Sequence, residues 1–267
     1  MPLTNLIVLA LIQGLTEFLP ISSSGHLIIV PNLINWHDQG LVIDVAVHAG
    51  SLLAVIIYLW RDLWSITAAL IDFRNLQQGP DLKLAKLIII ASIPVMIMGL
   101  IISLISDNLM RSVEIIGWAT LVFGILLGIS DKIGLSVNDL RHMGIGDAVL
   151  IGISQMLALI PGSSRAGLTI TMARFLGYDR RTAARFSLLL AIPAILGAST
   201  LKGIEVLETN NLTLGIDVLI AGSVSFLAAL ASISIMMAWL DRAGFMPFVI
   251  YRIILGAALL VWVYALS

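Results

Sequence analysis

The chain contains two similar short stretches, PISSSGHL at residues 20–27 and PGSSRAGL at residues 161–168. Each is polar and rich in helix-breaking residues, yet each lies inside an apolar region, at residues 3–33 and 148–176. The apolar pieces on either side are too short to cross a bilayer, which takes roughly 20 residues of helix. Non-helical backbone is tolerated at membrane depth only where protein or a water-filled cavity satisfies its polar groups. The pattern therefore predicts two re-entrant helix–loop–helix hairpins, each entering and leaving on one side of the membrane.

The composition places the whole chain in a membrane. Hydrophobic residues make up 59% of the 267 residues and charged residues only 12%, against roughly a quarter in soluble domains. So few charged side chains cannot cover a water-exposed surface, and the excess apolar surface must face lipid. The net charge of −1 gives no indication of a nucleic-acid partner. The chain has no cysteine, which excludes disulfides and thiolate metal sites.

Six further stretches are apolar and close to the length of a membrane span. They are Asp44–Trp60, Leu84–Ile105, Val113–Ile129, Thr182–Leu201, Ile216–Leu240 and Pro247–Leu266. Three of them follow each broken region, which gives an internal repeat within a single membrane domain, at about residues 1–130 and about residues 145–267. The odd number of crossings between the hairpins inverts the second repeat, so that the hairpin tips meet near the middle of the membrane. We therefore predict an all-α integral membrane protein with two inverted-topology repeats.

Basic residues are distributed unevenly between the two ends of the predicted spans. One end receives most of them: Arg61, Arg74, Lys83, Lys86, Lys132, Arg141, Arg174, Arg180, Arg181, Arg185, Arg242 and Arg252. The other end receives Arg111 and Lys202, and Arg165 lies inside the second stretch. Because cytoplasmic loops carry the excess of Lys and Arg, the first end is expected to be cytoplasmic. Both termini and the first serine stretch are then expected on the exterior side.

Ionisable residues within the predicted membrane regions are few, and most of them belong to the two broken hairpins. They are Glu17, His26, His48 and Arg165. Such residues are costly in lipid and usually functional, although His48 is expected to serve helix packing. Gln13 and Glu17 share a helix face at a spacing of four. Glu17 is expected to hold a divalent cation or to act as a base, whereas Gln13 fits equally well a hydrogen bond that holds the hairpin together.

A serine cluster with a nearby histidine follows the proline of the first stretch. Ser22, Ser23 and Ser24 are candidate nucleophiles, and His26 is close enough in sequence to activate one of them as a base. The alternative for one of the serines is to cap the following helix. The cluster therefore predicts nucleophilic chemistry without deciding which serine attacks.

The second stretch has the features of an anion-binding loop. Gly162 allows close approach of the backbone, and Ser163–Ser164 precedes a short helix whose first amides bind anions. Arg165 adds a bidentate donor suited to phosphate, and Thr169 offers a hydroxyl one turn further on. The alternative for Arg165 is an ion pair with Glu17, which an arriving anion could displace.

Together these groups fit phosphoryl transfer or hydrolysis on a lipid phosphate, where catalysis is mostly positioning and charge stabilisation. A hard cation such as Mg²⁺ or Ca²⁺ suits the oxygen ligands, and the sequence has no zinc-type ligand set. The rival interpretation is a secondary transporter or lipid-carrier flippase, since inverted repeats with broken helices are typical of transporters. A serine–histidine pair beside a carboxylate favours hydrolysis, because transport alone needs no nucleophile.

The two stretches with their flanks also resemble a known family. QGLTEFLPISSSGH at residues 13–26 and PGSSRAGLT at residues 161–169 are similar to the two signatures of bacterial undecaprenyl-diphosphate phosphatases of the bacitracin-resistance type. The resemblance covers nearly the whole chain. It implies hydrolysis of undecaprenyl diphosphate to undecaprenyl phosphate and inorganic phosphate, with Mg²⁺ or Ca²⁺. This reaction would recycle the lipid carrier of peptidoglycan synthesis at the exterior face of the bacterial inner membrane.

The resemblance and the residue patterns together define the candidate site. The candidate catalytic residues are Glu17, Ser23, His26 and Arg165, and Glu17 is also the candidate metal ligand; the candidate substrate-binding residues are Gln13, Ser22, Ser24, Gly162, Ser163, Ser164 and Thr169. We expect Ser23 to attack the terminal phosphorus with help from His26, and the alternative makes His26 the nucleophile. The expected partners are a prenyl diphosphate substrate and membrane lipid. The oligomeric state is left open, with a homodimer as one option.

Overall fold

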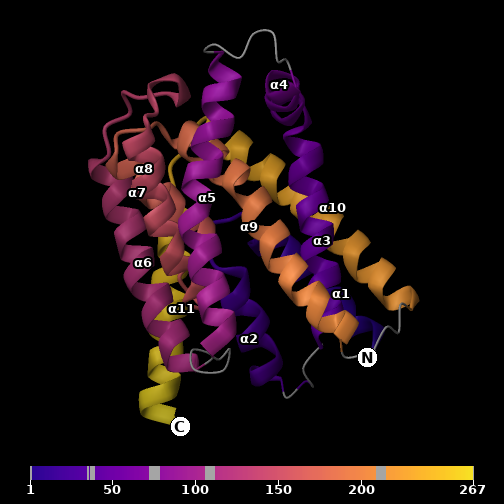
Figure 1. Cartoon of the computed structure of the whole chain (residues 1–267). Helices are drawn as coiled ribbons and strands as arrows, with labels where there is room; N and C mark the ends of the chain where they lie inside the picture. Colours follow the sequence, from indigo (N-terminus) through magenta and orange to yellow (C-terminus); the bar gives the residue numbers. More distant parts are fainter. Residues whose placement is uncertain are drawn as a thin grey trace.

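The computed structural model describes residues 2–34, 36, 40–71, 79–105, 112–208 and 215–266. In this described part the chain is almost entirely helical, with no strand beyond one isolated bridge between Asn138 and Tyr178. In chain order the α-helices are α1 (Leu3–Thr16), α2 (Ser23–Leu33), α3 (Leu41–Tyr58), α4 (Trp60–Ile71), α5 (Pro80–Ile105), α6 (Val113–Ile133), α7 (Ile145–Met156), α8 (Arg165–Phe175), α9 (Arg180–Glu208), α10 (Ile216–Leu240) and α11 (Met246–Val261). Figure 1 shows them as one elongated bundle, and the predicted all-α class is confirmed.

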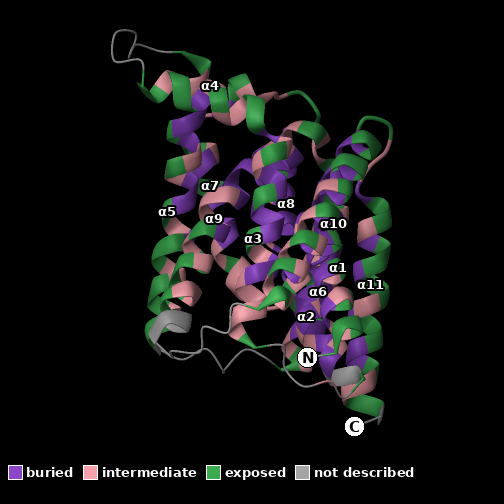
Figure 2. Ribbon diagram, turned by 90° about the vertical axis from the view of Figure 1, so that its right-hand side faces the viewer, coloured by how far each residue is buried: buried purple, intermediate pink, exposed green. Residues whose placement is uncertain are grey.

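Six of these helices are long and apolar enough to cross a bilayer. They cover Leu41–Tyr58, Pro80–Leu104, Val113–Ile133, Arg180–Ile204, Ile216–Leu240 and Met246–Ala265. Each overlaps one of the six stretches predicted from the sequence, so that this part of the prediction is confirmed. The outward faces of the bundle are exposed (Figure 2) and carry many large apolar side chains, such as Leu104 at 79% exposure. Such a surface is stable in lipid, and the chain is therefore a multi-pass membrane protein.

Four helices, α1, α2, α7 and α8, are too short to span a bilayer, which takes roughly 20 residues. In Figure 1, α1 and α2 lie toward one end of the bundle and α7 and α8 toward the other. The long helices enclose them: α1 packs against α10, α7 against α5, and α8 against both α6 and α9. Gly14 brings α1 so close to α10 that a Cβ there would lie 2.5 Å from the carbonyl oxygen of Ser225. The turns between the short helices are consequently buried, as Ser22 and Ser163 illustrate.

Helix α4 is an addition to the predicted elements. It follows α3 after a break at Leu59 and lies across the end of the bundle (Figure 2). Its Asp62 forms an ion pair with Arg185 of α9, while Trp64 is 73% exposed. An exposed tryptophan on a short amphipathic helix is typical of the interface between lipid and water. The predicted span that ended at Trp60 thus ends at Tyr58 and gives way to this separate helix.

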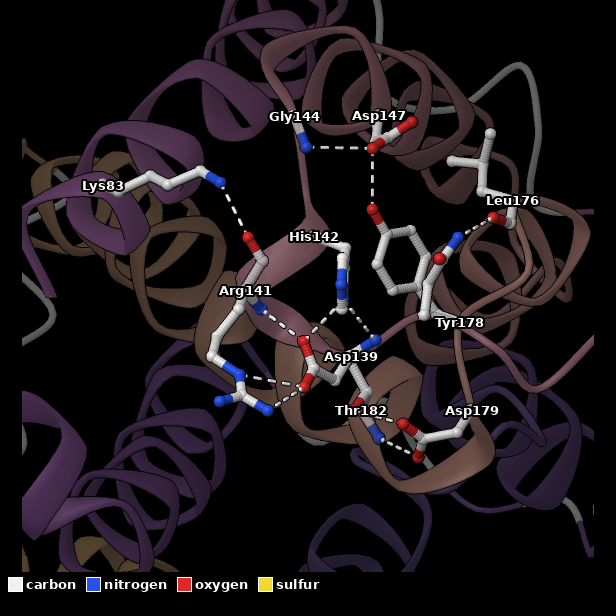
Figure 3. A network of polar contacts seen from close by, with 11 residues as sticks. Lys83, Asp139, Arg141, His142, Gly144, Asp147, Leu176, Tyr178, Asp179 and Thr182 are labelled. Atoms are coloured by element: carbon white, nitrogen blue, oxygen red, sulfur yellow. Dashed lines mark hydrogen bonds and ion pairs between the residues drawn. The ribbon is translucent and has the colours of Figure 1, made fainter. Parts of the chain in front are cut away.

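Loop contacts tie together the end of the bundle that carries α4 and the starts of α5, α7 and α9. Figure 3 shows one network there: Lys83 donates to the carbonyl of Arg141, Arg141 pairs with Asp139, and the hydroxyl of Tyr178 donates to Asp147. The hydrogen bond from Arg141 holds the pKa of the exposed Asp139 carboxyl down to about 2, so this pair persists at physiological pH. Burial raises the pKa of Tyr178, whose hydroxyl stays a donor. The network fixes the loop before α7 to the loop before α9.

Two of the basic residues counted at the predicted cytoplasmic end are buried. Arg174 is 1% exposed and Arg252 is 0% exposed, and both donate to backbone carbonyl groups. The assignment of both to the cytoplasmic end stays a prediction, and the structure adds that each guanidinium is held inside the bundle by carbonyls of neighbouring helices and loops. Arg74, counted at the same end, and Arg111, counted at the other end, lie outside the described residues.

Candidate active site

Helices α2 and α8 begin with the same backbone geometry. Their N-caps, Ser22 and Ser164, have left-handed φ angles of 74° and 69°, which residues with a side chain rarely adopt. The Ser22 hydroxyl accepts a hydrogen bond from the amide of Gly25, and the Ser164 hydroxyl accepts one from the amide of Gly167. Ser22 is therefore the capping serine of the first cluster, and Ser164 is its counterpart in the second.

This shared geometry shifts the predicted alignment of the two stretches by one residue. The alignment paired Pro20 with Pro161, but the matching N-caps pair Pro20 with Gly162. Gly162 has a φ of 91°, and a Cβ there would lie 2.6 Å from a backbone carbonyl oxygen of α6. Only glycine fits such a position. In the corrected alignment, Gln13 and Gln155 lie at the same distance before their N-caps.

The first helical positions after the two caps carry Ser23 in α2 and Arg165 in α8. The free amides of a helix N-terminus favour an anion, so both side chains lie beside anion-binding backbone. The two turns are in contact, because a Cβ on Gly25 would lie 3.5 Å from the Cα of Gly162. The predicted meeting of the two stretches is thus confirmed.

The carboxylate of Glu17 lies where the two turns meet. Its Oε2 accepts hydrogen bonds from Ser23 Oγ at 2.5 Å and from Gln13 Nε2 at 2.9 Å. Its Oε1 accepts one from Arg165 Nη2 at 3.4 Å, which is the ion pair that the sequence suggested. The side chains of Glu17 and Arg165 are 9% and 13% exposed, so water screens their attraction little. The serine hydroxyl, the carboxylate and the guanidinium therefore form one connected row.

His26 lies in the first turn of α2 but bonds to a different partner. Its Nδ1 is 2.6 Å from the carbonyl oxygen of Ser22, which can only accept, so Nδ1 carries the proton. In the neutral imidazole Nε2 then accepts from the hydroxyl of Tyr251 in α11 at 2.5 Å, and the two ring centroids lie 5.7 Å apart in a stacked arrangement. Within the described chain, His26 makes no hydrogen bond to a serine hydroxyl, and Ser23 donates to Glu17 instead. The role of His26 in a reaction stays a prediction.

The remaining candidate residues differ in their access to a ligand. Ser163 is 0% exposed, and its hydroxyl donates to a backbone carbonyl of its own turn. Thr169 is 1% exposed and donates to Ser187 Oγ at 2.7 Å, which ties α8 to α9. Ser24 is exposed, with its hydroxyl 3.3 Å from that of Ser22. Ser163 and Thr169 thus stabilise the second turn and its helix through buried hydrogen bonds, whereas the exposed Ser24 is accessible to a ligand.

Two adjacent residues of α11 belong to the site although sequence reasoning missed them. Tyr251 donates to His26, and Arg252 donates to the carbonyl oxygens of Pro20 and Gly162, each at 3.1 Å. A signal was available, because both residues lie inside the predicted span Pro247–Leu266. An arginine at such a depth is by default a functional candidate.

The oxygen atoms around Glu17 fit a hard divalent cation. Gln13 is completely buried, and its Oε1 has no hydrogen-bond partner among the described residues. This free amide oxygen lies on the side chain that contacts the Glu17 carboxylate, beside the Ser23 hydroxyl, and Mg²⁺ and Ca²⁺ take oxygen ligands of these kinds. The described residues hold no cluster of three or more His, Cys, Asp or Glu side chains. A cation here would therefore complete its shell with substrate phosphate oxygens or water.

Fold and site together define a class of protein: a multi-pass helical membrane protein in which a serine, a carboxylate and an arginine meet at the N-termini of two short buried helices. The chain belongs to the bacitracin resistance protein BacA family, whose sequence profile matches residues 6–258. The family resemblance noted in the sequence is thereby confirmed.

Several curated relatives match this chain along its full length. The undecaprenyl-diphosphatase of Jannaschia sp. (strain CCS1) is 50% identical over 271 residues, which cover 99% of this chain and 100% of the relative. The undecaprenyl-diphosphatase of Roseobacter denitrificans is 47% identical over 99% of this chain and 100% of the relative. The undecaprenyl-diphosphatase 1 of Rhodospirillum rubrum is 44% identical over 99% of this chain and 96% of the relative.

Proposed function

We propose that this protein hydrolyses undecaprenyl diphosphate to undecaprenyl phosphate and inorganic phosphate, and so recycles the lipid carrier of cell-wall precursors. The observation that carries the proposal is the 2.5 Å hydrogen bond from Ser23 Oγ to the Glu17 carboxylate, which also contacts Arg165. A hydroxyl held on a buried carboxylate is a nucleophile with its base in place. A guanidinium at a helix N-terminus suits a phosphate. The substrate is supported by the names of the relatives in the family.

The reaction begins when Glu17 takes the proton of Ser23, whose Oγ attacks the terminal phosphorus. A bond forms between Oγ and phosphorus while the bond from that phosphorus to the bridging oxygen breaks, and undecaprenyl phosphate departs with the electron pair. Glu17 releases that proton to the departing phosphate. It then takes a proton from a water molecule, whose oxygen bonds to the phosphorus as the bond between phosphorus and Ser23 Oγ breaks; the proton passes from Glu17 to Oγ, which restores Ser23 and frees inorganic phosphate. While Glu17 is neutral its attraction for Arg165 weakens, so the guanidinium is available to stabilise the charge on the transferring group.

His26 is the alternative nucleophile through Nε2. That route needs Tyr251 to release the imidazole, because its hydroxyl donates to Nε2 at 2.5 Å. The 2.5 Å hydrogen bond between Ser23 and Glu17 favours the serine route. We therefore assign His26 a supporting role beside the phosphate-binding end of α2.

We propose that Mg²⁺ or Ca²⁺ takes part, held by the carboxylate of Glu17 and by the free Oε1 of Gln13. Such an ion supplies positive charge that neutralises the phosphate oxygens. The residues of the chain itself keep the remaining tasks: Ser23 attacks, Glu17 moves the proton, and Arg165 binds the anion.

We further propose that α1–α2 and α7–α8 are re-entrant hairpins that head two inverted repeats, at about residues 1–130 and about residues 145–267, in a single membrane domain. The matching N-caps, the shortness of these helices and their placement at opposite ends of the bundle support this arrangement. The excess of basic residues at one end supports a cytoplasmic location for that end. Both termini would then face the exterior of a bacterial inner membrane.

Phosphate release from undecaprenyl diphosphate by the purified protein tests the proposed function. We expect release with Mg²⁺ or Ca²⁺ and its loss with EDTA. The Ser23→Ala variant should release phosphate at least about 10³-fold more slowly, since a nucleophile is lost. The matched control is Ser234→Ala, which removes an exposed hydroxyl that donates to a carbonyl of its own helix α10 and should leave the rate unchanged.

Two outcomes would contradict the proposal. Wild-type protein that releases no phosphate with either cation is not a diphosphatase, and a transporter of the lipid carrier would then be the better interpretation. Near wild-type release by Ser23→Ala would move the attack to His26. In that case quenched enzyme would carry an acid-labile phosphohistidine rather than the acid-stable phosphoserine that we expect.

A further inference from the structure

Arg252 is the arginine of α11 that lies beneath both turns. Its side chain is 0% exposed, and all its hydrogen bonds run to backbone carbonyl oxygens. Nη1 donates to Pro20 at 3.1 Å, and Nη2 donates to Gly162 at 3.1 Å and to Ser163 at 2.8 Å. Further bonds run to the carbonyls of Thr120 at 3.2 Å and Ala119 at 3.4 Å, both in α6. One guanidinium thus contacts the first turn, the second turn and a spanning helix.

The two turns offer Arg252 equivalent atoms. Pro20 and Gly162 occupy the same position before their N-caps, so the guanidinium takes the matching carbonyl from each hairpin. The surrounding chain leaves room for it: a Cβ on Gly124 or on Gly167 would lie 2.7 Å from an Arg252 atom. Carbonyls at fixed positions on three sides call for a planar group with several donors, which arginine has and lysine lacks. This side chain therefore bridges the two turns at equivalent positions.

The charge of Arg252 has no counter-ion among the described residues. No carboxylate of the described chain pairs with it, whereas the other arginine of the site, Arg165, is paired with Glu17. A buried cation solvated only by carbonyl dipoles is costly. It also leaves the turns with an uncompensated positive charge directly behind two anion-binding helix ends. That charge favours a diphosphate over a neutral group.

We propose that Arg252 is the positioning residue of this site, because it holds the first turn against the second so that Ser23 and Arg165 contact the same phosphate. Its unpaired charge also strengthens binding of the anionic head group. This inference rests on the proposed function for its substrate. It assigns to one side chain two effects that separate in an experiment. Geometry is expected to act on kcat and charge on KM.

The first experiment compares Arg252→Lys and Arg252→Met with wild type in steady-state phosphate release from undecaprenyl diphosphate. Both variants lose the fork that spans the turns, and kcat should fall about 10²-fold, the scale of a misplacement near 1 Å. Only Arg252→Met loses the charge, so its KM should rise about tenfold further than that of Arg252→Lys. Arg242→Met is the matched control, because Arg242 is an exposed arginine at the same end of the chain, and it should leave both constants unchanged. A wild-type kcat in Arg252→Lys would overturn the positioning role, and equal KM values in the two variants would overturn the role of charge.

The second experiment measures how accessible the second turn is, without using the enzymatic reaction. The chain has no cysteine, and Ser163 is 0% exposed in the second turn, so a Ser163→Cys background gives one buried thiol as reporter. Alkylation by N-ethylmaleimide should be slow in that background and in its Arg242→Met derivative, and at least about tenfold faster once Arg252→Lys frees the turns. Unchanged alkylation would overturn the inference even if phosphate is released. If alkylation is faster but wild-type protein releases no phosphate, the positioning role of Arg252 is supported and the proposed function is contradicted. If Arg252→Met does not accumulate, Arg252→Lys decides the matter.

Discussion

The first helical residue of α2 is Ser23, and the first helical residue of α8 is Arg165, although both helices start from the same turn. Each turn ends at a serine with a left-handed φ whose hydroxyl accepts from a glycine amide. The backbone therefore presents the same anion-binding helix end twice. What differs is the side chain that follows the cap: a hydroxyl held on Glu17 in one hairpin and a guanidinium in the other. A repeated backbone can thus place a hydroxyl and a guanidinium at equivalent positions and bring both to one carboxylate.

The two glutamines extend the same comparison upstream. Gln13 donates to Glu17, which lies one helical turn further on. At the position equivalent to Glu17 the second hairpin has Leu159, and Gln155, although completely buried, has no partner for either amide atom among the described residues. A buried amide without partners costs free energy of folding. The first glutamine thus has a carboxylate partner, whereas the second is buried without one.

Among the tests of this comparison, replacing Arg165 should have the largest effect on the rate of phosphate release. Arg165→Ala removes the group that faces Glu17, and kcat/KM for phosphate release is expected to fall about 10²- to 10³-fold, the cost of losing one donor to a developing charge. Arg165→Lys keeps the charge but loses the planar fork, so it should recover only part of the loss. Arg181→Lys, a change in the exposed ion pair with Asp241, is the control and should behave as wild type. Full activity in Arg165→Lys would mean that the second hairpin supplies charge and no geometry.

The glutamine pair offers a sharper contrast with a smaller effect. Gln13→Leu removes the donor that orients Glu17, and phosphate release should fall about 10- to 100-fold, as for other groups that orient a ligand. Gln155→Leu removes an amide that has no partner, and the free energy of unfolding should rise by about 1–3 kcal/mol while the rate stays unchanged. Thermal unfolding in detergent and the phosphate assay measure the two effects on the same samples. An inactive Gln155→Leu variant would show that the second hairpin also contributes a polar group to the reaction.

The spans and the central ion pair could be predicted from the sequence for simple physical reasons. Each span is a run of apolar residues as long as the bilayer is thick, and few charges in lipid leave few choices of partner, so Glu17 and Arg165 could be matched. The turns could not be aligned correctly, because two prolines suggested a register that the left-handed N-caps exclude. The two N-cap serines have left-handed φ angles that serine seldom adopts, and no residue pattern predicts such angles.

The partners of His26 and Arg252 escaped prediction for a different reason. His26 was expected to bond to a serine a few positions away, but its Nε2 bonds to Tyr251, which lies 225 positions further along the chain. Arg252 was counted only toward the cytoplasmic end, although it falls within a predicted span, and its carbonyl partners in both turns were not foreseen. The first prediction relied on closeness in sequence and the second on a count of basic residues, whereas the actual partners are set by long-range packing in the folded bundle.

The smallest effect tests whether the two turns are equivalent in energy as well as in shape. Ser22→Ala and Ser164→Ala each remove the capping hydroxyl and should lower the free energy of unfolding by about 1 kcal/mol. Ser22→Gly and Ser164→Gly also lose the hydroxyl, but glycine relieves the left-handed φ, so each should destabilise less than its alanine counterpart. Thermal unfolding of the four variants gives two alanine–glycine differences, one from each hairpin. Because the caps share φ and hydrogen bonding, these differences should agree, and a glycine that stabilises one hairpin while destabilising the other would show that only one of the turns holds its serine under strain.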